Sequence, residues 1–250
     1  MTSNLSFLFP QRNLAPVPAA AGKVIIVTGA TGPVGRELVP LLLASNANVI
    51  ASSRSEQRLS KLRSRSAEIL GSDLALLETV VADLRDQRAA CDLVDGVLQR
   101  HGRVDAVFHL VGGWSAGGVT GFDTEELSMM LANQVLPIAN ITTASLDPLV
   151  QSAGRFISIS TPAAAKPQAD NTLYASVKAA SESWVRALAD AFNGTEASAS
   201  FLIVSAVLTE RFAATNPTKN FTGWIVDHHL ARKLAENLGA HYINGIGIIA

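Results

Sequence analysis

The chain has 250 residues, a formal net charge of -1, 48% hydrophobic residues and 16% charged residues, the last against about 25% in an average soluble domain. The balanced charge gives no basic face for a nucleic-acid backbone or an anionic membrane surface. The length suits one α/β domain with a large core. The single cysteine, Cys91, excludes an internal disulfide and a thiolate zinc cage. We therefore expect a cytoplasmic protein with no metal, no nucleic-acid partner and no membrane partner.

The first 22 residues differ in composition from the rest of the chain. They contain three prolines, and Arg12 follows the short apolar segment LSFLF instead of preceding it. A signal peptide needs a positive start and then an unbroken apolar stretch. We predict a flexible arm over residues 1–22, with a targeting segment as the alternative, and a single domain over residues 23–250. No apolar run reaches the roughly 18 residues of a membrane helix.

From Lys23 onward, short apolar segments alternate with longer segments of helical spacing. The apolar segments are nearly continuous, as buried parallel strands are, and they cover residues 24–29, 47–52, 77–82, 105–111, 155–160, 199–205 and 241–249. The helices predicted between them include residues 33–45, 55–70, 85–100 and 173–192. Right-handed crossovers between such strands give an α/β fold, a single Rossmann-type doubly wound domain. We expect a seven-stranded, mostly parallel sheet with helices on both faces, and a kink or early end at Pro40 in the first helix.

A glycine-rich turn links the first predicted strand to the first predicted helix. Gly29, Gly32 and Gly35 form the pattern G-x-x-G-x-x-G. A dinucleotide site needs such a tight turn, backbone close to the pyrophosphate, and close packing of helix on strand, and amides at the helix start bind the anion. A purely structural turn is the alternative, but the place directly after the first strand favours a cofactor site. The candidate contacts are Gly29, Thr31, Gly32, Val34 and Gly35.

The end of the second predicted strand indicates which nicotinamide cofactor is bound. It carries Ser53 and Arg54, with no acid before Glu56. A carboxylate at this place usually holds the ribose hydroxyls of NAD, whereas an arginine accommodates the extra phosphate of NADP. Small hydroxyls and Arg54 therefore favour NADP(H) over NAD(H), unless Arg54 is only a solvated residue at a helix start. Asp83, which closes the third strand, is expected to reach the adenine.

Tyr174 and Lys178 lie four residues apart, early in the helix predicted over residues 173–192, so they share one helix face. A free tyrosine has a pKa of about 10. A neighbouring cation favours the phenolate and lowers that pKa, which would make the hydroxyl a usable acid or base near neutrality. In isolation this pair of residues is common on protein surfaces, so its meaning depends on what accompanies it.

What accompanies it is a set of further motifs: the glycine turn, the strand before Gly112, Asn133, and the hydroxyl residues before Pro162. In this order and spacing, residues 23–250 resemble the short-chain dehydrogenase/reductase family. In that family, hydride moves between a nicotinamide and the substrate carbon, and the tyrosine exchanges a proton with the substrate oxygen. The resemblance implies that Tyr174 is the acid/base, that Lys178 modulates it and holds the ribose, and that Asn133 anchors a proton-relay water.

Departures from the family pattern bear on the substrate. The usual serine, thirteen residues before the tyrosine, is Thr161 here, with Ser160 beside it. We expect Thr161 to bind the substrate carbonyl, with Ser160 as the alternative. The segment after the fourth strand reads His-Leu-Val-Gly, and we expect His109 to be a packed strand-end residue. The resemblance implies three further residues that contact the cofactor: Val111, Gly112 and Thr209.

Aromatic residues suggest where a substrate would bind. The segment from Gly112 to Gly118, together with the loop from Leu208 to Trp224, resembles the dihydropteridine reductase branch of the family, whose pterin could stack on an aromatic ring such as Trp114. Alternatively, Trp114 lines an apolar pocket. Phe212 and its neighbours give the segment after the sixth strand an apolar inner face, as a substrate lid would have. We predict an NADP-dependent oxidoreductase that acts on the carbonyl or alcohol of a small apolar molecule, and by resemblance a homodimer or homotetramer. The alternatives are a dihydropteridine-reductase-like enzyme for a quinonoid substrate and a non-catalytic NADP-binding sensor.

Overall fold

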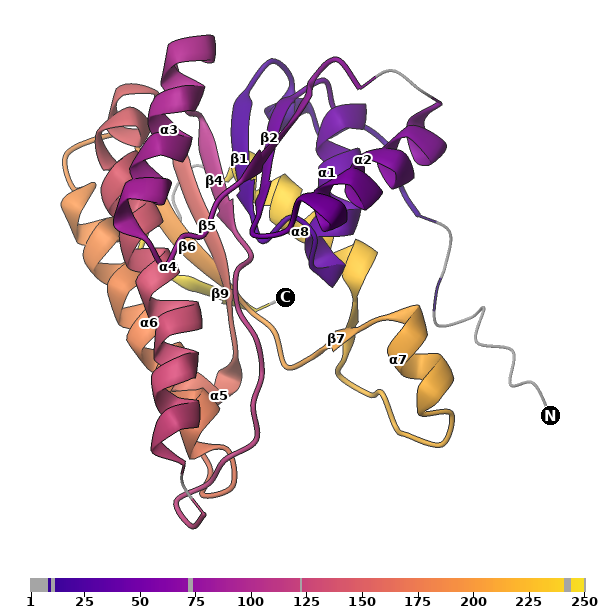
Figure 1. The fold of residues 1–250 in the computed structure, drawn as a ribbon, viewed down its shortest axis with the longest axis vertical. Coiled ribbons are helices and arrows are strands. Elements are labelled where there is room, and N and C mark those ends of the chain that lie inside the picture. The colour runs from indigo at the N-terminus through magenta and orange to yellow at the C-terminus, as the bar shows by residue number, and fades with distance from the viewer. Residues whose placement is uncertain (1–8, 10–11, 72–73, 122, 241–243, 250) are drawn as a thin grey trace.

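The computed structural model describes residues 9, 12–71, 74–121, 123–240 and 244–249. They form a seven-stranded sheet in the order β3-β2-β1-β4-β5-β6-β9, and every pairing in it is parallel (Figure 1). The strands are β1 (Val24–Thr28), β2 (Asn48–Ser53), β3 (Leu77–Val81), β4 (Ala106–His109), β5 (Arg155–Ser160), β6 (Ser198–Ile203) and β9 (Gly247–Ile249). The last strand is shorter than the predicted 241–249, of which residues 241–243 lie outside the described residues.

Two layers of helices cover the sheet, one on each face (Figure 1). One layer contains α1 (Pro33–Ala44), α2 (Glu56–Leu70) and α8 (Asp227–Glu236), and the other contains α3 (Gln87–His101), α4 (Thr124–Gln151) and α6 (Thr172–Ala191). The predicted α/β, doubly wound Rossmann-type fold is therefore confirmed. The strand order reverses between β1 and β4, and in such sheets ligands bind beyond the carboxyl ends of the strands at that point.

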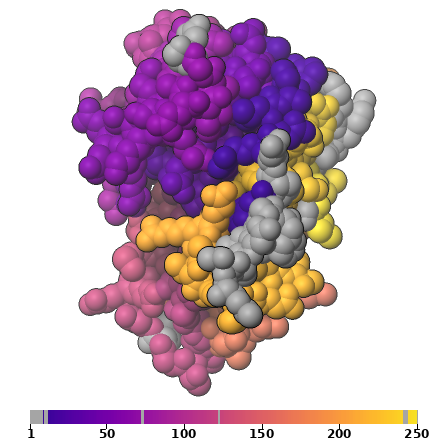
Figure 2. Space-filling view, turned by 90° about the vertical axis from the view of Figure 1, so that its right-hand side faces the viewer, coloured from indigo at the N-terminus to yellow at the C-terminus, as the bar shows by residue number. Residues whose placement is uncertain are grey.

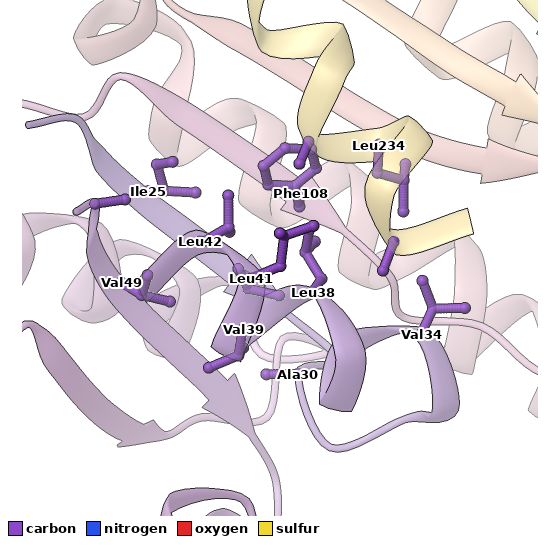
Figure 3. Packing of buried hydrophobic residues seen from close by; sticks show 14 of the residues in the cluster. Ile25, Ala30, Val34, Leu38, Val39, Leu41, Leu42, Val49, Phe108 and Leu234 are labelled. Atoms are coloured by element: carbon purple, nitrogen blue, oxygen red, sulfur yellow. The ribbon is translucent and has the colours of Figure 1, made fainter. Parts of the chain in front are cut away.

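Strand β1 shows why the apolar segments are continuous. Ile25 and Val27 pack with α1 and α8, whereas Val24 and Ile26 pack on the opposite face. Successive side chains of a strand point to opposite faces, so a strand covered on both sides has no polar position to spare. Figure 3 shows one of these two cores, in which side chains of α1 lie against Phe108 and side chains of α8.

Helix α1 continues through Pro40 to Ala44, so the early end expected at this proline does not occur. Proline removes one backbone hydrogen bond, but Leu38, Leu41 and Leu42 are all at most 2% exposed against the sheet. Burial of one whole face outweighs the local preference, because most helix stability in proteins comes from tertiary packing.

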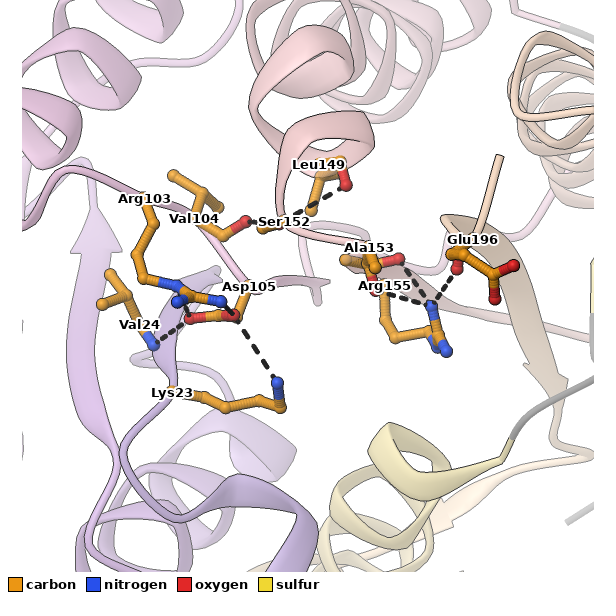
Figure 4. Close-up of polar contacts among 11 residues, drawn as sticks. Lys23, Val24, Arg103, Val104, Asp105, Leu149, Ser152, Ala153, Arg155 and Glu196 are labelled. Carbon is orange, nitrogen blue, oxygen red and sulfur yellow. Dashed lines mark hydrogen bonds and ion pairs between the residues drawn. The ribbon is translucent and has the colours of Figure 1, made fainter. Parts of the chain in front are cut away.

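A buried carboxylate, Asp105, fixes the amino ends of the two central strands, and Figure 4 shows its contacts. The glycine-rich turn lies at the opposite, carboxyl end of β1. Asp105, just before β4, accepts a hydrogen bond of 2.9 Å from the Val24 amide and pairs with Arg103 and Lys23. These contacts join the starts of β1 and β4. The parallel pairing of β1 with β4 keeps the same register up to their carboxyl ends, where Thr28 lies opposite His109.

Residues 12–17 lie against α1 and α8, where Arg232 Nη2 donates to the carbonyl oxygens of Asn13 and Ala15, both at 2.6 Å. Arg12 Nε donates to Glu37 Oε2 at 2.7 Å, and the buried Val17 donates its amide hydrogen to Ser45 Oγ at 2.9 Å. Figure 2 shows the indigo N-terminal part beside the yellow of the C-terminal part. The division into an arm (1–22) and a domain stays a prediction, but the end of the arm is packed. Residues 1–8 and 10–11 lie outside the described residues.

The segment between β6 and α8 holds elements that the sequence did not predict. Strands β7 (Val207–Leu208) and β8 (Ile225–Val226) form a small parallel sheet, with helix α7 (Glu210–Thr215) between them. This segment stands apart from the main sheet (Figure 1), and a short helix α5 (Pro162–Ala165) follows β5. Among the described residues, none of the helices combines the length and hydrophobicity that a membrane span requires.

Candidate active site

A cleft of about 740 Å³ lies beyond the carboxyl ends of β1 to β4, where the strand order reverses. Its walls are the glycine turn, the ends of β2 and β3, the segment after β4, and one side of α4. It brings together eight of the residues that the sequence assigned to the cofactor: Gly29, Thr31, Gly32, Ser53, Arg54, Asp83, Val111 and Gly112.

Two glycines of the turn are required by close backbone packing. Gly29 has a φ of +67°, and a Cβ on it would stand 2.7 Å from the Leu110 carbonyl carbon. A Cβ on Gly35 would stand 2.5 Å from the Ala30 carbonyl oxygen, so α1 begins directly against the turn. Gly35 and the buried Val34 do not line the cleft; they pack α1 onto the sheet. Their predicted cofactor contact is therefore not a side-chain contact.

The end of the cleft near β2 and β3 is basic. Arg54, Arg58 and Arg85 line it, and Asp83 is the only carboxylate among the described residues that do so. Arg85 Nε donates to both carboxylate oxygens of Asp83 at 3.0 Å, and this bidentate pairing lowers the pKa of Asp83. The excess of positive charge suits a phosphate group. Nearby, Ser53 Oγ and Thr31 Oγ1 are 3.0 Å apart and hydrogen-bonded.

Two of these arginines were missed in the sequence. Arg58 lies in the first turn of α2, and its amide donates to the Ser55 hydroxyl that caps this helix. Its place at the start of a helix that follows the second strand was visible in the sequence and could have identified it. Arg85 lies two residues after Asp83, and only the fold shows that it reaches the same cleft.

Tyr174 lies in the first turn of α6, facing Thr161 at the end of β5. Burial raises the pKa of the Tyr174 phenol, and a hydrogen bond with the Thr161 side chain acts in the opposite direction. The phenol therefore holds its proton at neutral pH. The expected lowering of this pKa by Lys178 is not found.

Lys178 lies one turn further along α6, and its contacts explain why it does not lower the pKa of Tyr174. Its Nζ donates to the Ile159 carbonyl oxygen at 3.0 Å. Burial lowers the pKa of Lys178 to about 8, and the nearby charge of Glu182 acts in the opposite direction. The ammonium is thus held by the backbone of β5, at the same end of the sheet as Tyr174.

The two hydroxyl residues at the end of β5, Ser160 and Thr161, face different partners. Ser160 Oγ donates to Glu182 Oε1 at 2.5 Å, whereas Thr161 Oγ1 accepts from the Ala163 amide at 3.4 Å and lies at Tyr174. Neighbouring residues of an extended chain point in opposite directions, so both cannot serve the same site. Of the two, Thr161 is therefore the residue beside Tyr174.

Asn133 lines the cleft, but its side chain does not point toward Lys178. Its Oδ1 accepts a hydrogen bond of 3.4 Å from Arg54 Nη1. The next residue, Gln134, is 3% exposed and donates from Nε2 to the Gly113 carbonyl oxygen at 3.1 Å. Gln134, which the sequence did not single out, borders a small cavity together with Lys178.

His109 is a packed strand-end residue, as expected. It is 3% exposed, stacks on Phe156, and its Nδ1 lies 2.9 Å from Thr28 Oγ1. Burial, assisted by the charge of Lys178, lowers the pKa of His109 to about 3. The imidazole is therefore neutral at ordinary pH.

The predicted substrate residues divide into two groups. Trp114 lines the cleft and is 72% exposed, so its ring is free to meet a ligand. Phe212 does not line the cleft: it stacks on Trp224 with ring centroids 5.3 Å apart, inside a cluster of its own. Thr209 caps α7 by accepting the Phe212 amide at 3.2 Å, and it is not among the residues lining the cleft.

Comparison with known proteins adds to this geometry. The family model described as short chain dehydrogenase matches residues 23–220. An uncharacterized oxidoreductase of Staphylococcus epidermidis is 26% identical over 159 residues, which make up 63% of this chain and 66% of that protein. The chain thus spans slightly less than two thirds of that relative's length.

Two solved structures have the same fold. The structure of ElxO with NADP bound has a TM-score of 0.81 at 16% identity and covers 91% of this chain and 96% of that chain. A short chain dehydrogenase of Shigella flexneri 2a complexed with NADP has a TM-score of 0.82 at 20% identity, covering 93% of this chain and 98% of that chain.

Proposed function

Because the chain belongs to the short-chain dehydrogenase family, we propose that it is an NAD(P)-dependent oxidoreductase, that it uses NADP(H) and that Tyr174 is its acid/base. The substrate is the carbonyl or alcohol of a small, rather apolar molecule. The observation that carries this proposal is the meeting of Tyr174, Thr161 and Lys178 at the carboxyl end of β5, beside the cleft.

The residues of the cleft fit the cofactor. The glycine turn offers backbone where no Cβ fits, at the start of a helix, which suits a pyrophosphate. Arg54 and Arg58, with Ser53, suit the additional phosphate of NADP. When bound, NADP(H) supplies or accepts the hydride. Bound NADP in two structures of the same fold supports this choice.

In the direction of carbonyl reduction, Tyr174 gives a proton to the substrate oxygen. The raised pKa of its phenol suits this role, because a protonated tyrosine is the form that donates. Thr161 holds the same oxygen with its hydroxyl. Lys178 and Asn133 have the roles that the family resemblance gives them, as holder of the ribose and as anchor of a relay water, although the side chain of Asn133 is turned to Arg54 in the structure.

Tyr174→Phe tests the proposal, since it keeps the ring and removes the proton. We expect NADPH to bind almost as tightly as in the parent, and turnover to fall about 10²–10⁴-fold, the scale of general acid catalysis. The measurements are NADPH oxidation with ketones, aldehydes, quinones and quinonoid pterins, and a Kd for NADPH by calorimetry. Unchanged turnover of an ordinary ketone by Tyr174→Phe would show that the acid/base assignment is wrong. A chain that binds NADPH but turns over no substrate would be a sensor.

The exposed Trp114 supports one alternative substrate class. A quinonoid pterin is flat and could stack on this ring at the cleft. Such a substrate accepts hydride readily and depends less on a donated proton. A small effect of Tyr174→Phe on a pterin, together with a strong rise in KM for Trp114→Ala, would favour the dihydropteridine-reductase-like activity.

Exposed apolar side chains on α4 and α6 support a homo-oligomer. Met129, Leu131 and Leu136 on α4 and Trp184 on α6 are 39–56% exposed. Burying them against a second copy would remove apolar surface from water. A homodimer or homotetramer remains the expectation, as does the cytoplasmic location.

A further inference from the structure

Lys178 borders a second, much smaller cavity, which shares Val111 and Gln134 with the lining of the cofactor cleft. Its volume is about 10 Å³, close to the room that one water molecule needs. Polar side chains from β4, α4, β5 and α6 line it: His109, Gln134, Ser158, Ser160, Ser181 and Glu182. A polar cavity next to the catalytic lysine calls for an explanation, because buried polar groups are stable only when they are paired.

The charged member of this set is Glu182, one helical turn after Lys178. Its side chain is 12% exposed, and Oε1 accepts the 2.5 Å hydrogen bond from Ser160 Oγ. Its other oxygen, Oε2, lies 3.4 Å from Arg186 Nη2, at the surface. The carboxylate is thus fixed from two sides, with one edge toward the cavity that Lys178 borders.

The other groups around this cavity carry no negative charge. From β4 comes the neutral His109, from α4 the amide of Gln134, from β5 the hydroxyls of Ser158 and Ser160, and from α6 the hydroxyl of Ser181. Among the described residues, Glu182 is therefore the only anionic side chain that lines it.

We propose that Glu182, fixed by Ser160, is a positioning residue that keeps Lys178 in its charged form. Placing an ammonium inside a protein disfavours the charge, and an opposite charge a few ångströms away restores it. The proposal accounts for both hydroxyls at the end of β5: Thr161 faces Tyr174, and Ser160 donates a hydrogen bond to the Glu182 carboxylate. Only its consequence for turnover rests on the proposed function.

The sign of the effect follows from the charges. Burial lowers the pKa of Lys178 to about 8, and the charge of Glu182 raises it against that trend. Without the carboxylate, the pKa falls further, and a larger part of the protein carries a neutral Lys178 near neutrality. Loss of the ammonium would weaken its hold on the cofactor ribose and its influence on Tyr174.

The charge of Lys178 can be measured without catalysis. The chain has only six lysines (Lys23, Lys61, Lys166, Lys178, Lys219 and Lys233), so ¹³C labelling of lysine Cε gives few NMR signals, and Lys178→Arg identifies the one of interest. We expect the Lys178 titration midpoint to fall by about one pH unit or more in Glu182→Gln. Ser160→Ala, which only frees the carboxylate, should give a smaller fall. Glu196→Gln, which removes an exposed carboxylate, should leave the midpoint unchanged.

Turnover gives a second readout. The high-pH limb of kcat/KM should move to lower pH in Glu182→Gln and return in Glu182→Asp. An unchanged Lys178 midpoint in both Glu182→Gln and Ser160→Ala would overturn the proposal, and reduced turnover with that midpoint unchanged would show a structural role. Failure of the proposed function would instead appear as normal turnover by Tyr174→Phe, whatever the lysine titration shows.

Discussion

The turn between β1 and α1 and the segment between β6 and α8 were both predicted to contact ligand, and they are held by different forces. The turn is held by backbone: the Gly32 amide donates to the Gly29 carbonyl oxygen at 3.0 Å, and Gly35 lies directly on Ala30. The second segment, residues 204–226, is held by aromatic side chains that stack on each other. Backbone demands for glycine can be recognised in a sequence, whereas the partner that an aromatic ring chooses cannot.

The largest effect is expected from a side chain added to the turn between β1 and α1, and a turn that tolerated it would contradict the comparison. Gly35→Ala places a Cβ 2.5 Å from the Ala30 carbonyl oxygen, and backbone on both sides leaves little room to adjust. We expect the free energy of unfolding to fall by about 3 kcal/mol, the upper part of the range for overpacking, and NADPH affinity to fall with the displaced turn. Chemical denaturation and calorimetry measure both. Gly96→Ala is the control, because a Cβ there meets only the flexible end of the Arg100 side chain, at 3.1 Å, and Gly96 does not line the cleft.

The fold could be predicted because burial on both faces leaves a clear pattern. The strand segments were found to within a few residues, apart from the last, and right-handed crossovers between them imply a parallel, doubly wound sheet. The order of the strands in that sheet comes from the structure. The elements that were missed, β7, β8 and α7, are two to six residues long, too short to show a period. At Pro40, local preference predicted a kink or an early end; the helix does not end there, because packing on the sheet outweighs that preference.

The site could be predicted only where chemistry is tied to a position along the chain. The Tyr174 and Lys178 pair needs just one helical turn, so its spacing identifies it. Asn133 and Gln134 are adjacent on α4, and the rotation of the helix against the sheet decides which one approaches Lys178. Glu182 also lay outside the prediction, since its meaning comes from a cavity to which four elements contribute.

An effect of intermediate size is expected from the positive charge of the cleft, which the sequence predicted through Arg54. Arg54→Ala should weaken NADPH binding by about 2 kcal/mol, the scale of a hydrogen bond to a charged group, and leave NADH binding nearly unchanged. Paired calorimetric titrations with the two cofactors measure this. Arg36→Ala removes an exposed arginine that does not line the cleft, and it should change neither Kd. Equal losses for NADPH and NADH would mean that Arg54 does not bind the extra phosphate, and Arg58→Ala would then be the next variant to measure.

The smallest effect should come from Thr209, which lies in the segment between β6 and α8 but was predicted to contact the cofactor. Its hydroxyl accepts the Phe212 amide at 3.2 Å and so caps the six-residue helix α7. Loss of such a cap costs about 1 kcal/mol, and we expect Thr209→Ala to speed amide hydrogen exchange over residues 207–226 while the NADPH Kd stays the same. Thr215→Ala is the control, since that hydroxyl bonds only to the Arg211 and Phe212 carbonyl oxygens of its own helix and to the side-chain amide of the adjacent Asn216. If Thr209→Ala instead weakened NADPH binding with exchange unchanged, Thr209 would be the cofactor contact that the family resemblance implies. The segment after β6 would then move toward the cleft when the cofactor binds, because a hydroxyl outside the cleft lining can reach the ligand only by such a movement.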